Sequence, residues 1–265
     1  GRKGRSKKNH NPCMSTTIII NPKYASISEF LHSIPSVFEH EGREIYNDRN
    51  IIKVIEAPDG TELNVKRYCV PKGPNRFVYS SGIRKPKGLR AFRYPLRMRA
   101  LGIETPEPIA YIEERSFGIL GLSYFISQQC GYEHTLKDVG DAEPGTYEEL
   151  AESLGRFTAE MHDKRVLHRD FSPGNVLYHM DEDGDYHFSL VDINRMHFGP
   201  VGEKQGCLNF IRLWGPKHFI ELLVRSYADA RGFDSAKCVA FTLAARRHFW
   251  LSYRKKHRVL FKLEL

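Results

Sequence analysis

The chain has 265 residues, enough for one two-lobed domain or two small ones. Hydrophobic residues make up 41% of it and aromatic residues 12%, so its composition is that of a folded globular protein and excludes a disordered one. The formal net charge of +8 is typical of a protein that meets an anionic partner, such as a nucleotide, nucleic acid, acidic lipid or phosphorylated glycan; solubility alone is the alternative explanation.

The cysteines and the lengths of the apolar runs indicate the cellular compartment. The five cysteines are scattered and form no C-x-x-C pair, which predicts neither a disulfide framework nor a zinc site and favours a reducing compartment. No stretch approaches the ~18 apolar residues of a membrane span, and the run Ile18–Ile20 is too short for a signal peptide. We therefore expect a cytoplasmic protein without a transmembrane segment. Residues 1–20 are predicted to be a basic tail, with Met14 a candidate natural start.

The first predicted element is a short helix over Ser26–Ser33. Ser26 and Glu29 have the spacing of a capping box, and apolar residues follow at helical spacing. Pro35 is expected to end this helix.

Two strands joined by a tight turn are predicted next. They cover Ile51–Ala57 and Thr61–Val70, with Pro58-Asp59-Gly60 between them. Lys66 lies in the second strand, where a rigid element would hold it toward nucleotide phosphates; a solvated strand lysine is the alternative.

A basic span follows, since residues 63–103 contain no Asp or Glu. So many positive charges without a negative one repel each other and destabilise the folded state unless anions bind there. A solvated helix face is the alternative explanation. Leu89, Phe92 and Leu96 predict one apolar helix face, Pro95 is expected to kink or split that helix, and Gly102 to end it. The eleven basic residues of the span are Lys66, Arg67, Lys72, Arg76, Arg84, Lys85, Lys87, Arg90, Arg93, Arg97 and Arg99. No zinc finger, RRM motif or aromatic platform accompanies them, which disfavours nucleic acid as the partner.

A stiff linker, Thr105-Pro106-Glu107-Pro108, leads into strands over Ile109–Ile112 and Gly118–Ser127. Residues 128–133 then read as a hinge. We accordingly expect a first lobe over residues 21–129 and a second over residues 130–265.

The second half begins with a helix and ends in helices. Thr146 and Glu149 have capping-box spacing, and an apolar core stripe follows. The later helices are expected over Leu208–Leu213, Lys217–Ala230 and Ser235–Lys256.

Between these helices lies a stretch of the form H-R-D-x-x-x-x-N, His168 to Asn175. Val176–His179 and Tyr186–Val191 read as a hairpin closed by an acidic turn, which returns Asp192 to the side of Asn175. Phosphoryl transfer from ATP needs an oriented acceptor hydroxyl and metal ions held against the phosphates. Asp170 has the chemistry for the first task, and Asn175 and Asp192 offer the oxygen ligands that magnesium prefers.

These residues resemble the protein-kinase-like superfamily. By that resemblance Lys66 is the strand lysine that pairs with the ATP phosphates, Asp170 the catalytic aspartate, and Asn175 and Asp192 the magnesium ligands. The implied fold is α+β and two-lobed: a small antiparallel-sheet lobe with one helix, then a mainly helical lobe. The chain beyond Asp192 leaves no room for a long activation loop, as in small bacterial kinases.

Two further segments are similar to the lipopolysaccharide kinase family. They are Val191-Asp192-Ile193-Asn194-Arg195 and Gly102-Ile103-Glu104-Thr105-Pro106-Glu107-Pro108-Ile109. That resemblance implies ATP- and magnesium-dependent phosphorylation of a Kdo or heptose sugar of the inner core, by a cytoplasmic enzyme peripheral to the anionic inner membrane. The partner would be an anionic glycolipid or sugar acceptor.

The sequence departs from the superfamily pattern at two points. The loop Asn47–Asn50 has no glycine to cover phosphates, and Arg93 stands where an acidic partner for Lys66 is expected. These departures leave open a catalytically weak pseudokinase acting as a binding module. A small-molecule or RIO-like protein kinase is the other alternative, because such enzymes share the loop and the metal aspartate.

Overall fold

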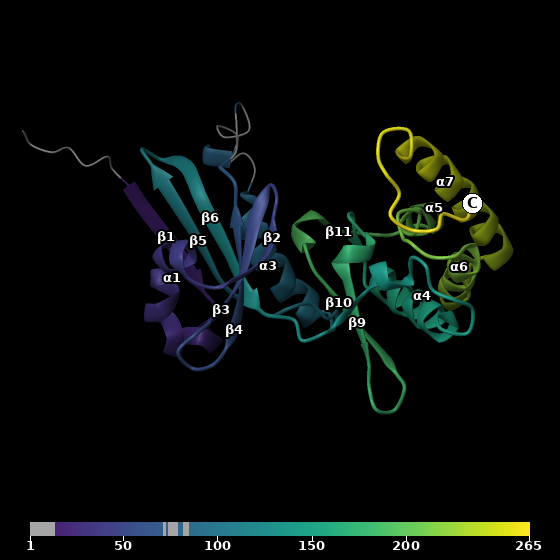
Figure 1. The fold of residues 1–265 in the computed structure, drawn as a ribbon, viewed down its shortest axis with the longest axis horizontal. Helices are drawn as coiled ribbons and strands as arrows, with labels where there is room; N and C mark the ends of the chain where they lie inside the picture. Colours follow the sequence, from purple (N-terminus) through teal and green to yellow (C-terminus); the bar gives the residue numbers. More distant parts are fainter. Residues whose placement is uncertain (1–13, 71–72, 74–78, 82–84) are drawn as a thin grey trace, which may run out of the picture. The chain divides into compact units, whose positions relative to one another are not determined.

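The computed structural model describes residues 14–70, 73, 79–81 and 85–265, and the chain divides into two units (Figure 1). The first unit holds the residues up to Arg93 together with Glu107–Gln129, and the second holds Tyr94–Pro106 and Cys130–Leu265. The tail residues 1–13 and Lys72, Arg76 and Arg84 of the basic span lie outside the described residues.

The first unit is built on a six-stranded antiparallel sheet of order β1-β5-β6-β4-β3-β2. Its strands are β1 (Met14–Ile20), β2 (Arg43–Asn47), β3 (Asn50–Glu56), β4 (Glu62–Tyr68), β5 (Pro108–Ser116) and β6 (Ile119–Gln128). The four predicted strands correspond to β3, β4, β5 and β6. Residues 14–20, expected in the tail, instead form β1; both β1 and β2 were missed because their residues are exposed or only half-buried and show no alternation.

One face of the sheet is covered by α1 (Ser28–His40), which follows the short 3-10 helix η1 (Pro22–Ile27). The predicted end at Pro35 is wrong, because the helix continues through this proline. Leu31, Ile34 and Phe38 are buried against the sheet, and this burial outweighs the lost hydrogen bond at the proline. The predicted Ser26–Glu29 box does not form, since α1 begins only at Ser28 and is preceded by Ile27 without a side-chain cap.

The helix of the basic span is α3 (Lys87–Ala100), which continues through Pro95 without being split. The predicted apolar face is shifted: Leu96 is 44% exposed, whereas Pro95 is buried. The buried positions, Gly88, Ala91, Phe92, Pro95 and Met98, recur every three or four residues, so the helix turns Leu96 to solvent.

Gly102 ends α3 as predicted. It has a φ of 71°, and its amide donates to the carbonyl of Arg99 at 2.9 Å. The amide of Ile103 reaches back to the carbonyl of Met98 at 2.9 Å, which completes a Schellman motif.

The second unit is mainly helical. Its helices are α4 (Glu148–Asp163), α5 (Glu203–Leu208), α6 (Lys217–Arg231) and α7 (Ser235–Tyr253), with 3-10 helices η2 (Leu136–Val139), η3 (Pro173–Asn175) and η4 (Ile193–Arg195). Short strands complete it: β7 (His134–Thr135), β8 (Val166–His168), β9 (Val176–Met180), β10 (Tyr186–Leu190) and β11 (Met196–Phe198). The predicted hairpin is confirmed as β9 and β10, which pair antiparallel and project as a long ribbon in Figure 1.

Two local predictions in this unit are wrong. The helix expected over Leu208–Leu213 ends at Leu208, and turns held by the amides of Phe210 and Leu213 replace it. The Thr146–Glu149 box is absent because α4 begins at Glu148, whose own carboxylate accepts from the amide of Gly145 at 2.8 Å.

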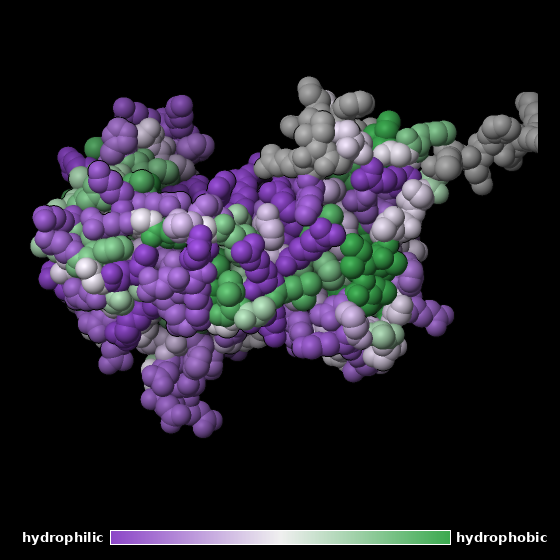
Figure 2. Space-filling view, turned by 180° about the vertical axis from the view of Figure 1, so that it is seen from behind, coloured by the Kyte–Doolittle hydropathy of each residue, from purple (hydrophilic) through white to green (hydrophobic). Residues whose placement is uncertain are grey.

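None of the helices in the described part of the chain is long and apolar enough to cross a membrane. Figure 2 shows polar residues over much of the visible face, interrupted by smaller hydrophobic areas.

Helices α4 and α6 of the second unit pack closely at Gly155. A Cβ at this position would lie 2.5 Å from the carbonyl oxygen of Leu223 and 2.9 Å from the amide nitrogen of Tyr227. Both atoms belong to the backbone of α6, so neither can move aside easily.

We expect Gly155→Ala to destabilise the protein by about 1–3 kcal/mol, because overpacking outweighs the helix propensity that alanine adds. Gly131→Ala is the matched control, since a Cβ there meets nothing within 4 Å. Urea denaturation of both variants measures the difference; equal free energies of unfolding would show that the contact is not tight.

Candidate active site

The stretch predicted to be catalytic, His168 to Asn175 (called the catalytic loop below), begins at the end of β8 with His168, whose exposed fraction is 0%. The Nδ1 atom of His168 accepts from the amide of Asp170 at 3.0 Å, so the ring proton is on Nε2, which donates to the carbonyl of Val191 at 3.0 Å. Burial lowers the pKa of His168 and keeps the ring neutral. One imidazole therefore joins the catalytic loop to the residue before Asp192.

The backbone in front of Asp192 is held at four points. The amide of Leu190 donates to the carbonyl of Glu104 at 3.1 Å, and its carbonyl accepts from Oγ1 of Thr105 at 2.7 Å. The amide of Val191 donates to the carbonyl of Asn175 at 3.0 Å, and its carbonyl accepts from His168. All four backbone groups are thus satisfied by segments that are distant in sequence from β10, and the strand end is fixed.

Asp192 itself adopts the left-handed conformation, with φ 52° and ψ 43°. A non-glycine residue in this region costs roughly 1–2 kcal/mol, and such residues concentrate at functional sites. The amide group of Asn194, which is 6% exposed, donates to Oδ1 of Asp192 at 2.7 Å. The carboxylate direction is consequently set by a neighbour two residues away.

Asn175 closes the catalytic loop. Its Nδ2 donates to the carbonyl of Asp170 at 2.9 Å, which leaves Oδ1 of the same side chain as an oxygen ligand. Together with the Val191 amide bond, this contact brings the predicted residues Asp170, Asn175 and Asp192 into one connected arrangement within the second unit. Sequence reasoning predicted this local topology.

Asp170 has a partner that no motif predicted. Its Oδ1 forms an ion pair with Nη1 of Arg212 at 2.7 Å, and its side chain is 26% exposed. Arg212 lies in the turn after α5, 42 residues from Asp170, so sequence spacing carried no signal for the contact.

A chain of hydrogen-bonded side chains connects the loop to the core of the second unit. Asn209 donates through Nδ2 to the carbonyl of His168 at 2.9 Å, and its Oδ1 accepts from Nε2 of His162 at 3.3 Å. The other ring nitrogen of His162 accepts from the hydroxyl of Tyr227 at 2.8 Å, and that hydroxyl accepts from Arg231 at 2.8 Å. Burial lowers the pKa of His162 to about 3. Sequence reasoning missed this chain, because the residues that join it to His168 (Asn209, His162, Tyr227 and Arg231) stand in no motif.

Lys66 belongs to the first unit and lies in β4 opposite Phe125 of β6, which in turn pairs with Tyr111 of β5. Val65, its neighbour, points toward α1, so the alternation of the strand places Lys66 on the other face of the sheet. Its ammonium group lies 5.3 Å from the ring centroid of Tyr68.

A buried acid shares the sheet face of Lys66. Glu113 is 8% exposed and accepts from the hydroxyl of Tyr111 and from Nε of Arg115, both at 2.5 Å. Arg93, at the position where the superfamily resemblance implies an acid, is exposed on α3.

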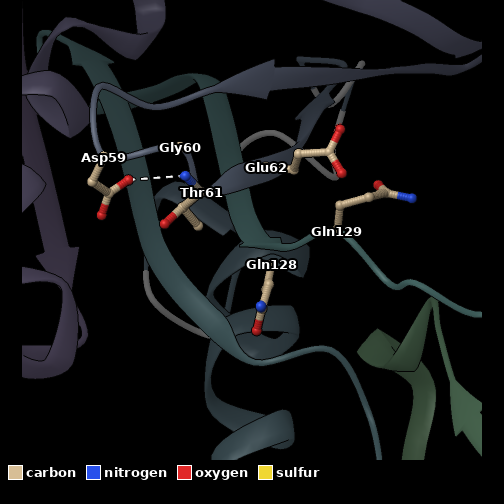
Figure 3. A pocket seen from close by; sticks show the side chains of 6 residues that line it. All are labelled: Asp59, Gly60, Thr61, Glu62, Gln128 and Gln129. Carbon is tan, nitrogen blue, oxygen red and sulfur yellow. Dashed lines mark hydrogen bonds between the residues drawn. The ribbon is translucent and has the colours of Figure 1, made fainter.

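A separate polar pocket of the first unit lies between the β3–β4 turn and the end of β6 (Figure 3). In it the amide of Thr61 donates to the carboxylate of Asp59 at 3.0 Å, which lowers the pKa of Asp59. Its lining contains none of the predicted site residues and no cation, so it is not suited to phosphate. The lining residues are Asp59, Gly60, Thr61, Glu62, Gln128 and Gln129.

Comparison with known proteins gives a family and a fold. The model of the lipopolysaccharide kinase (Kdo/WaaP) family matches residues 74–214, slightly more than half of the chain. Among curated proteins, none matches.

Two solved structures are similar over most of the chain. One is WaaP in complex with acyl carrier protein, with 15% identity, a TM-score of 0.58, and coverage of 88% of this chain and 99% of that chain. The other is the amicoumacin kinase hAmiN in complex with AMP-PNP, Ca²⁺ and Ami, with 12% identity, a TM-score of 0.55, and coverage of 91% and 90%. At these identities the likeness shows the fold alone.

The antiparallel sheet unit, the mainly helical unit and these neighbours define a protein-kinase-like α+β fold, which confirms the predicted fold class. Within that class, the chain belongs to the lipopolysaccharide kinase (Kdo/WaaP) family.

Acid should destabilise the protein through His162. Above the ordinary histidine pKa near 6.5, the ring is neutral in both the folded and the unfolded state. Between that pH and about pH 3, the ring is protonated in the unfolded chain and stays neutral in the folded protein. The free energy of unfolding therefore falls with pH in this window, by roughly 1 kcal/mol per pH unit from this residue.

Urea denaturation of wild type and His162→Gln between about pH 4 and 7 tests this, since the variant lacks the titrating ring. The difference in unfolding free energy between the two proteins should shrink as the pH falls. His32→Gln, at an exposed position, is the control. Parallel pH curves for wild type and His162→Gln would contradict the expectation.

Proposed function

We propose that the protein is an ATP- and magnesium-dependent kinase that phosphorylates a sugar hydroxyl of a lipopolysaccharide core, on Kdo or heptose, or of a related glycolipid. The observation that carries the proposal is the connected arrangement of Asp170, Asn175 and Asp192 inside the span that matches the family. The family supports a kinase, and the residues supply the groups that this reaction needs.

The donor set fits a magnesium ion. Asn175 offers Oδ1 and Asp192 offers its carboxylate, and magnesium is usually held by one or two protein oxygens together with substrate phosphates and water. Among the residues that the structure describes, no group of three His, Cys, Asp or Glu side chains could hold a metal, so the ion would rely on those further ligands. When bound, magnesium would neutralise charge on the ATP phosphates.

The acceptor hydroxyl would be oriented by Asp170. Its Oδ2 has no partner among the described residues, whereas Oδ1 is held by Arg212. The acceptor oxygen forms a bond to the γ-phosphorus, the bond from that phosphorus to the β–γ bridging oxygen breaks, and ADP leaves with the electron pair. The hydroxyl proton goes to Oδ2 of Asp170 and then to solvent.

For Lys66 we propose the role that the superfamily resemblance implies, pairing with the α- and β-phosphates of ATP. Its place on the sheet face away from α1 supports this role. We further propose that exposed basic residues of α3 contact the acceptor phosphates or an anionic membrane surface at the cytoplasmic side. Arg93 is one candidate on this helix, since it is exposed, whereas Arg97 stacks on Phe198 and Arg99 donates to the carbonyl of Thr105.

A pseudokinase is the second candidate, favoured by the β2–β3 connection. The hairpin joins Asn47 to Asn50 without glycine, so side chains occupy the loop that would approach phosphates.

The two aspartates should separate these functions. We expect Asp170→Asn to lower transfer to core glycolipid by roughly 10²–10⁴-fold while the protein keeps a magnesium-dependent thermal shift with ATP. Asp192→Asn should lose the magnesium dependence of that shift. Asp229→Asn, on the exposed surface of α6, is the control.

Phosphate transfer is measured with radiolabelled ATP and isolated inner-core glycolipids. Wild-type transfer no greater than that of Asp170→Asn would overturn the enzymatic proposal, and a shift that does not depend on magnesium would favour the pseudokinase.

A further inference from the structure

The turn over residues 209–213, which carries Arg212, is anchored on both sides of that residue, to the catalytic loop before it and to α7 after it. Before Arg212, the ring of Phe210 meets the ring of Phe171 edge to face at 6.2 Å between centroids. After it, the carbonyl of Leu213 accepts from Nη1 of the buried Arg246 at 2.8 Å. With Asn209 bonded to the carbonyl of His168, the backbone on both sides of Arg212 has defined anchors.

Within the described part of the chain, the guanidinium of Arg212 forms hydrogen bonds through one edge only. Nη1 pairs with Oδ1 of Asp170 at 2.7 Å, and the group lies 6.0 Å from the ring centroid of Phe249 on α7. The side chain is 47% exposed, and its other N–H groups have no hydrogen-bond partner among the described residues. An arginine carries five N–H donors in a rigid fork, so several donors remain available beside Asp170.

A second cation borders the same loop. Lys137 of η2 is exposed, and a Cβ at Gly174 would lie 3.0 Å from its Cε and 3.4 Å from its Nζ. The lysine stem therefore occupies the space that the glycine leaves open. In the part of the chain that the structure describes, the ammonium group of Lys137 has no ion-pair partner.

The loop between the two polar ends of the motif is itself uncharged, as it reads Phe171-Ser172-Pro173-Gly174. Besides Arg169, which precedes Asp170 in the motif, two cations from outside the motif lie against this loop, Arg212 and Lys137. Arg212 is paired with the carboxylate that would orient the hydroxyl, and Lys137 lies against Gly174 of the same loop. Two cations with open donors at this loop match an acceptor that carries its own negative charge.

We propose that Arg212 is a specificity-determining residue that bridges Asp170 and an anionic substituent of the acceptor, a carboxylate or a phosphate close to the reacting hydroxyl. This inference rests on the proposed function and names the acceptor feature that the site selects. One edge of the guanidinium stays on Oδ1 of Asp170, and the remaining N–H groups hold the anion, so the hydroxyl is placed at Oδ2. Lys137, which lies against Gly174, adds positive charge beside the same loop.

The test compares matched acceptors in a kinetic assay. The probes are an inner-core glycolipid, the same glycolipid after its phosphates are removed, and the same glycolipid with its carboxylates converted to amides. The proteins are wild type, Arg212→Gln, Arg212→Lys and, as the control, Arg247→Gln at an exposed position on α7. KM for the acceptor, KM for ATP and acceptor-independent ATP hydrolysis are measured for each.

We expect Arg212→Gln to raise KM for the unmodified glycolipid roughly ten- to hundredfold, the usual range for a charge-assisted hydrogen bond, and to leave KM for ATP within about twofold. For wild type, KM should rise by the same factor when one of the two modified acceptors replaces the unmodified glycolipid. On that modified acceptor, Arg212→Gln should have the same KM as wild type. Whichever modification has this effect identifies the anion as a phosphate or a carboxylate. Arg212→Lys should recover part of the affinity, because it keeps the charge without the fork.

An equal loss by Arg212→Gln on all three acceptors would overturn the inference and leave Arg212 as a positioning residue for Asp170. Unchanged kinetics would overturn it as well. Absence of transfer by wild type to every acceptor is a different result, which refutes the proposed function and with it the inference that depends on it.

Discussion

The arrangement of Asp170, Asn175 and Asp192 depends on the two hydrogen bonds of the neutral, buried imidazole of His168. The ring can accept from the amide of Asp170 only while Nδ1 is unprotonated, and it can donate to Val191 only while Nε2 carries the proton. Protonation would turn Nδ1 into a donor facing another donor. The burial that lowers the pKa of His168 therefore favours the neutral form, in which the ring can bond both to the loop of Asp170 and to the strand end before Asp192.

This arrangement requires a polar chain inside an apolar core. The chain runs from His168 through Asn209 to His162, and the ring of Phe171 packs against His168 while that of Phe210 packs against both Phe171 and Tyr227. A buried polar group is costly when it has no partner, so a chain in which each member donates and accepts in turn has one stable orientation. The same chain orients the turn that carries Arg212, and packing in the core is thereby coupled to the charge at Asp170.

The parts of the fold that could be predicted are those with a local cause. The β9–β10 hairpin and the cap at Gly102 follow from alternation and turn chemistry within a few residues. Pro35 was misleading because burial of the residues around it decides where α1 ends, and β2 was missed because its residues are all exposed. The contact of Arg212 with Asp170 spans 42 residues and has no periodic or spacing signal, so only the folded chain reveals it.

The segment Glu104–Thr105 explains why two distant stretches of sequence share one resemblance. Both residues bond to Leu190, two positions before Asp192, although 85 residues separate Thr105 from its partner. Thr105 is 2% exposed, so water cannot replace its hydroxyl as the donor to the Leu190 carbonyl. A residue without a side-chain donor at this position would leave that carbonyl unpaired. Residues 94–106 accordingly belong to the second unit, while the strands on either side of them in sequence belong to the first. The strand end before Asp192 is thus held by both the hairpin and this segment, and for this reason the linker and the Asp192 stretch are one structural element of the site.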